Sequence, residues 1–205
     1  MPMNELNKRL HAILKNDFYP FLRQYGFITK KGINYRISGD SVAQWIKVEK
    51  SRWNTGDMLH FDLDLYVSYG DPGPDIKVDN EMDLVSIGRP TVFRRLCELD
   101  NSHDTHFGFY HTTDDTLFAN ELRERFTSVA LPFFEQGITI DGMIAFLLAE
   151  KNLCYERGNF AIVGLLYCKK GDQINARRYL MEAPEPMDMK ILAAREYGLD
   201  LTQPQ

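Results

Sequence analysis

The chain has 205 residues, of which 44% are hydrophobic and 26% are charged, a composition typical of a globular protein with a substantial core. Its formal net charge of -5 argues against nucleic acid as the partner, because phosphate binding requires a basic surface. The three cysteines form no Cys-x-x-Cys pair, and no segment has the length of a signal peptide core or a membrane span, so we expect a cytoplasmic protein without disulfides or membrane contact.

The first elements are a helix and a short strand. Apolar residues recur at helical spacing from Leu6 to Leu14. Pro20 interrupts this pattern, which predicts a helix to about Asn16 and then a kink or a second short helix to Tyr25. The alternation of apolar and polar residues over 33–37 predicts the first strand.

The stretch 41–68 predicts a β-hairpin. Its second half alternates strictly, so Leu59, Phe61, Leu63, Leu65 and Val67 share one face of a strand, while His60, Asp62, Asp64 and Tyr66 share the other. The turn formers in 51–57 allow the chain to reverse there. This pattern predicts an antiparallel sheet with one covered face and one face in contact with water.

Two further strands are expected over 91–99 and 105–111, after a turn-rich, acidic segment that spans 69–90. The predicted fold is therefore α+β. It consists of a five-stranded antiparallel meander packed by an N-terminal helix and later helices, with a helical C-terminal extension. We expect a sheet domain over 1–137 and the extension over 138–205.

The extension contains a helical hairpin over Phe160–Ala183. Gly171 is suited to end the first helix and Asp172 to cap the second. The spacing of Gly164, Tyr167 and the residues that follow resembles one tetratricopeptide repeat, but only one copy is present and a solenoid needs about three.

The sequence contains none of the common catalytic or nucleotide-binding motifs: it has no phosphate loop, dinucleotide fingerprint, serine-hydrolase elbow or His-Glu-x-x-His motif. His60, Asp62 and Asp64 share a strand face, and His106 or His111 could approach them from another strand. Such a group could bind a divalent metal or act as an acid and a base, but alternating polar residues are also what any exposed sheet face presents. Cys97 is expected to be a buried structural thiol, and no metal or cofactor is expected.

The two tryptophans suggest a binding surface. Trp45 belongs to the polar face of the hairpin and Trp53 to its loop. Large aromatic residues on a polar surface are typical of interfaces, although other parts of the chain could also cover them.

Several short motifs resemble a bacterial domain-of-unknown-function family, number 4304. They are Gly26-Phe27, Lys31-Gly32, Tyr35-Arg36 and Val48-Glu49-Lys50-Ser51-Arg52-Trp53-Asn54. Glu49 stands where the family commonly has Gln, and His106-Phe107-Gly108-Phe109-Tyr110 replaces a strand that contains tryptophan. The resemblance covers about residues 5–135 and is strongest over 26–67.

This resemblance implies a non-catalytic module that binds another protein, because some members of the family look like immunity proteins of bacterial toxin systems. The matching positions are Arg36, Lys50, Ser51, Arg52 and Trp53. A structural role is equally open, in which Arg36 or Arg52 pairs with Asp62 or Asp64 across strands. An enzyme on the polar face and an adaptor acting through the C-terminal hairpin are the alternatives.

Overall fold

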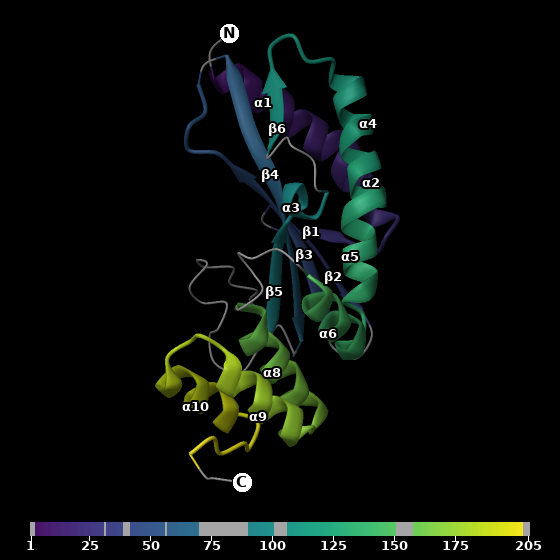
Figure 1. Ribbon diagram of the computed structural model, residues 1–205. Coiled ribbons are helices and arrows are strands. Elements are labelled where there is room, and N and C mark those ends of the chain that lie inside the picture. The colour runs from purple at the N-terminus through teal and green to yellow at the C-terminus, as the bar shows by residue number, and fades with distance from the viewer. Residues whose placement is uncertain are drawn as a thin grey trace. The chain divides into compact units, whose positions relative to one another are not determined.

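A computed structural model describes residues 3–30, 32–38, 42–55, 57–69, 90–100, 106–150 and 158–202 (Figure 1). The chain forms two compact units. The first comprises Met1–Ile37, Ala43–Val67 and Phe93–Glu135, and the second comprises Ser38–Val42, Ser68–Val92 and Gln136–Gln205. The expected segment 69–90 lies almost entirely outside the described residues, and the predicted division at 137/138 stays a prediction.

The α+β class and the antiparallel sheet are confirmed, but the sheet has six strands. They are β1 (Ile28–Lys30), β2 (Ile33–Ser38), β3 (Val42–Lys50), β4 (Met58–Tyr69), β5 (Thr91–Arg95) and β6 (Phe107–Tyr110). The first five follow one another in meander order, whereas β6 pairs antiparallel with β4. Strand β1 was not predicted, and the last strand returns to β4 instead of extending the meander.

The predicted strand over 91–99 is too long. Strand β5 ends at Arg95, and the short helix α3 (Leu96–Leu99) follows. The Glu98 side chain accepts a hydrogen bond from the Arg95 backbone N–H at 2.9 Å, which fixes the first turn of the helix. Strand β4 therefore pairs with three strands: β3, β5 and, along its first residues, β6.

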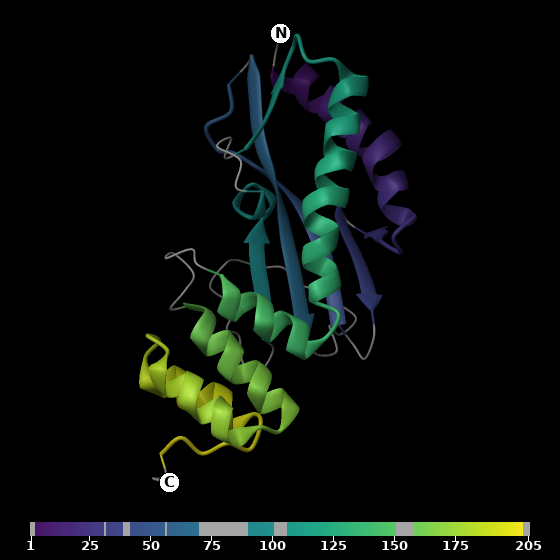
Figure 2. The same cartoon turned by 45° about the vertical axis from the view of Figure 1, so that its right-hand side comes forward.

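In the first unit, two long helical segments cover one face of the sheet (Figure 2). One consists of α1 (Met3–Ile13), a π-helical turn η1 (Leu14–Phe18) and α2 (Tyr19–Arg23). The other consists of α4 (Asp115–Arg125), a π-helical turn η3 (Phe126–Ala130) and α5 (Leu131–Gln136). The expected apolar side of β4 is confirmed, since the side chains from Leu59 to Val67 on that face are all buried.

Each π turn directly precedes a proline. Pro20 and Pro132 are the second residues of α2 and α5. Just before them, the Tyr19 N–H bonds to the Leu14 carbonyl and the Leu131 N–H bonds to the Phe126 carbonyl, each reaching back five residues. Proline lacks an N–H group and its ring clashes with the carbonyl four residues earlier, so the wider turn lets each helix continue. The expected break at Pro20 is therefore a π turn.

In the second unit, the described helices are α6 (Ile140–Ala149), α8 (Gly158–Lys170), α9 (Gln173–Glu182) and α10 (Met187–Arg195). The predicted helical hairpin is confirmed as α8 and α9. Gly171 has a positive φ of 79°, and the Asp172 side chain accepts a hydrogen bond from the Asn175 N–H. Both features match the expected turn between the helices.

Helices α8 and α9 approach closely at Gly164. A Cβ atom at this position would lie 2.6 Å from Leu180 Cγ and 3.1 Å from the Leu180 backbone N. We expect Gly164→Ala to lower the melting temperature, because overpacking costs about 1–3 kcal/mol whereas the gain in helix propensity is only about 1 kcal/mol. Thermal unfolding of Gly164→Ala, Leu180→Ala and the double variant checks this. The double variant should lose less stability than the sum of the singles, and strict additivity would contradict the contact.

Candidate functional site

The face of β4 opposite the helices carries the polar residues singled out in the sequence. The prediction that this face meets water is wrong for the middle of the strand. Asp62 is 3% exposed and Asp64 is 4% exposed. Nearer the hairpin end, Glu49 of β3 is exposed on this face.

An aromatic row explains part of this burial. The Trp45 and Tyr66 rings stack with their centroids 5.2 Å apart, and Tyr66 contacts Phe93 at 5.0 Å. Trp45 is only 7% exposed, and its indole Nε1 has no hydrogen-bond partner among the described residues. The alternation thus placed Trp45 on the correct face, but its side chain is largely enclosed.

Asp64 is a buried carboxyl near two cations, Arg95 and Lys47. Arg95 Nε lies 3.8 Å from Asp64 Oδ1, which is too long for a strong hydrogen bond. Burial raises the pKa of Asp64 to about 7; Arg95 opposes this rise, and Glu49 and Asp62 add to it. The suggested partners Arg36 and Arg52 are not the cations found here.

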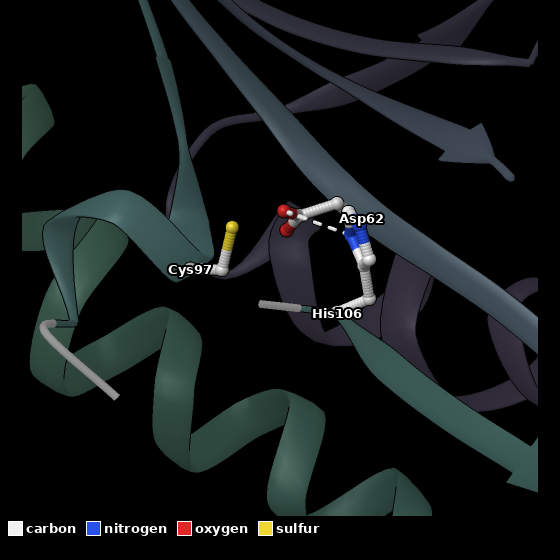
Figure 3. A group of neighbouring side chains, drawn as sticks. All are labelled: Asp62, Cys97 and His106. Carbon is white, nitrogen blue, oxygen red and sulfur yellow. Dashed lines mark ion pairs between the residues drawn. The ribbon is translucent and has the colours of Figure 1, made fainter. Parts of the chain in front are cut away.

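Asp62, Cys97 and His106 converge from three different elements (Figure 3). Asp62 belongs to β4, Cys97 to the first turn of α3, and His106 directly precedes β6. Asp62 Oδ2 lies 3.8 Å from His106 Nδ1, and one ligand atom from each of the three residues lies within 4.8 Å of the other two. Cys97 is buried, as expected, but its place beside Asp62 was not foreseen, because a strand was expected to continue through it.

The Asp62 carboxylate has a hydrogen-bond partner for only one of its two oxygens among the described residues. Asp62 Oδ1 accepts a hydrogen bond from the Leu63 N–H at 2.7 Å, whereas Oδ2 has no hydrogen-bond partner among the described residues. Burial raises the pKa of Asp62, opposed by the Cys97 thiol, the Leu63 N–H and His106. Burial, reinforced by Asp62, raises the pKa of the Cys97 thiol to about 12. A free thiol in this setting is a poor nucleophile.

His60 stands slightly apart from the cluster. Its ring centroid lies 6.5 Å from that of His106, and its Nε2 atom lies 2.9 Å from the sulfur of Met58. Of the two histidines expected to approach this face, His106 lies beside Asp62. His60 remains at the edge of the cluster.

The hairpin tip is held in a defined conformation by its own side chains. Asn54 accepts a hydrogen bond from the His60 N–H at 2.6 Å and donates one to the His60 carbonyl at 3.1 Å. The Ser51 hydroxyl accepts from the Trp53 N–H at 3.1 Å. Trp53 itself is 82% exposed, and Arg52 is exposed beside it.

The other two matching positions make contacts within the fold. Lys50 donates a hydrogen bond to Asn7 at 2.6 Å. Arg36 lies on the helix-covered side of the sheet, where its guanidinium bonds to Gln44 and to the Tyr25 carbonyl and packs 4.8 Å from the centre of the Phe27 ring. The contacts of Arg36 are those of a structural residue, and it does not join the hairpin tip.

These features define an α+β domain with a buried polar cluster on one sheet face and an exposed aromatic tip. The model of a family described as a domain of unknown function (DUF4304) matches residues 18–136, more than half of the chain, and the chain belongs to this family. No curated protein and no solved structure matches the chain. A tetratricopeptide relationship of the C-terminal hairpin is not confirmed.

Within the described part of the chain, no single helix is long and apolar enough to cross a membrane. The bent pair formed by Asp115–Gln136 and Ile140–Ala149 passes the same test, but by length and composition only.

Proposed function

We propose that this protein is a non-catalytic module that binds another protein through the tip of the β3–β4 hairpin. The observation that supports the proposal is the 82% exposure of Trp53 in a turn whose backbone is fixed by Ser51 and Asn54. A large aromatic side chain on an ordered turn loses little conformational entropy on binding, which is the property of an interface anchor.

A finer form of this proposal is an immunity-type protein in the cytoplasm, whose partner is a toxin. It rests on the resemblance of the family to such proteins, together with the exposed Arg52 and Trp53 pair. Trp and Arg are the residue types that dominate interface hot spots, so we expect the partner to contact both side chains.

Replacing Trp53 with alanine should weaken partner binding while leaving the fold intact. Loss of a hot-spot tryptophan costs about 2 kcal/mol or more, which corresponds to roughly a thirtyfold rise in Kd. The experiment captures partners from a lysate of the native host with wild-type protein and Trp53→Ala, quantifies them by mass spectrometry, and then measures Kd with the purified partner.

Leu117→Ala is the matched control, because Leu117 is also a large exposed apolar residue of the first unit, at 69% exposure. It should keep the partner that Trp53→Ala loses. A stoichiometric partner retained by Trp53→Ala, or a large fall in the melting temperature of that variant, would contradict the proposal.

One observation favours a different binding surface. The last two helices expose several large apolar side chains: Ile174, Met181, Met187, Met189 and Leu192. An adaptor function through the C-terminal helices would use this surface, and a partner retained by Trp53→Ala would point to it.

A further inference from the structure

We propose that Asp62, Cys97 and His106 form a binding site for a divalent cation of the zinc class. The site is separate from the hairpin tip, and it does not depend on the proposed partner-binding function. It joins three side chains of the first unit that the strand order brings together, although they lie far apart in the sequence.

The geometry of the cluster supports the proposal. In Figure 3, the Asp62 carboxylate points from β4 toward the Cys97 sulfur, and the His106 ring approaches the same carboxylate from the start of β6. The ligand atoms lie within 4.8 Å of one another, and the Asp62–His106 pair is at 3.8 Å. Ligand atoms around a tetrahedral zinc ion lie about 3.3–3.5 Å apart. For the Asp62–His106 pair, a small rotation of His106, whose side chain is 42% exposed, would close the difference.

The unsatisfied oxygen of Asp62 is the second, independent observation. Oδ2 is buried and lacks a hydrogen-bond partner among the residues that the structure describes, yet it is the oxygen nearest His106. A buried carboxylate oxygen without a partner is unfavourable, because it loses its hydration and gains nothing in exchange. A cation between Asp62, Cys97 and His106 would replace the lost hydration.

The types of ligand select the class of cation. Thiolate, imidazole and carboxylate together suit zinc and similar borderline ions, whereas magnesium and calcium prefer oxygen ligands. A thiolate and a carboxylate balance the two positive charges of the ion, with His106 neutral. Three protein ligands would leave the fourth tetrahedral position for water or another molecule, as in zinc sites that are not purely structural.

The test uses the full chain without a histidine tag, stripped of metal with a chelator and titrated with Co²⁺. We expect one equivalent to bind with a thiolate-to-cobalt charge-transfer absorption that excess Zn²⁺ abolishes. Cys97→Ser should lose this absorption. Cys168→Ser is the matched control, because the Cys168 thiol is equally buried at 8%, and this variant should keep the absorption.

A second variant keeps the proposal testable if Cys97→Ser does not fold. His106→Ala removes a ligand whose side chain is 42% exposed, so it should fold normally and bind Zn²⁺ at least tenfold more weakly in a competition titration. Absence of a saturable cobalt signal in the wild type, or an unchanged signal in Cys97→Ser, would overturn the proposal. Unchanged zinc affinity in His106→Ala would do the same.

Discussion

Replacing Phe126 with alanine is expected to lower the free energy of unfolding by about 3–5 kcal/mol, the usual cost of truncating a fully buried phenylalanine. Phe126 is fully buried and is the first residue of the π turn η3. Its ring lies 5.2–6.3 Å from the ring centroids of Phe18, Phe21, Tyr25 and Phe27, each in an edge-on arrangement. Alanine would leave a cavity where both helical segments and β1 meet.

Urea unfolding of the purified variant measures this loss, with Leu117→Ala as the control. Leu117 precedes Phe126 on the same helical segment but is exposed, so its truncation should change stability by no more than about 0.5 kcal/mol. A cost below about 1 kcal/mol for Phe126→Ala would contradict the assignment of this cluster as the centre of the first unit's core.

Replacing Asp64 with asparagine is expected to stabilise the protein increasingly as the pH rises. The pKa of Asp64 is raised from 3.8 to about 7, so the folded state binds the proton more tightly than the unfolded state. Stability must therefore fall as the pH rises from about 4 to about 7, because the folded chain has to give up that proton. The loss can reach about 4 kcal/mol above pH 7, at 1.36 kcal/mol per pKa unit.

The measurement compares urea unfolding of wild type and Asp64→Asn at pH 4.5 and pH 8, with a chelator present in both. The advantage of the variant should be small at pH 4.5 and largest at pH 8. An advantage that does not change with pH would mean that the nearby cations fully compensate the ionised Asp64 carboxylate, and one that shrinks as the pH rises would mean that they favour it; either result would contradict the raised pKa.

The sequence predicted the local features that depend on short-range patterns. The alternation along β3 and β4 placed Trp45 on the same sheet face as Asp62 and Asp64, and the Gly171-Asp172 turn is confirmed. Period-2 patterns and turn residues act over a few positions, so they can be identified without knowing the rest of the fold.

The features that the sequence did not reveal depend on partners far away along the chain. The alternation in β6 is compatible with pairing to either β5 or β4, and only the tertiary fold decides between them. Helix α3 has Arg95 at its N-cap position instead of Ser, Thr, Asp or Asn, so the sequence gave no recognisable signal that a helix begins there. The cluster of Cys97, Asp62 and His106 depends on both features, because α3 carries Cys97 and the pairing of β6 with β4 brings His106 to Asp62.

The burial of the polar face was missed for a related reason. Alternation identifies which side chains share a face, but it does not say what lies over that face. The stacked Trp45, Tyr66 and Phe93 rings and the approach of Arg95 to Asp64 come from three separate strands and the residues next to them. These side chains meet because β3, β4 and β5 are neighbours in the sheet.

The two π turns also bear on how chain length can vary in this family. A π turn holds one more residue than an α-helical turn, so Leu14–Phe18 and Phe126–Ala130 each contain a residue that a regular helix would not need. Deleting that residue would rotate every later side chain of the helix by about 100° relative to those before it. Phe18 and Phe126 touch across the two turns, so a length change in one helix would misalign its contacts with the other. A family member that lacks the extra residue in one helix would therefore need a compensating change in the second.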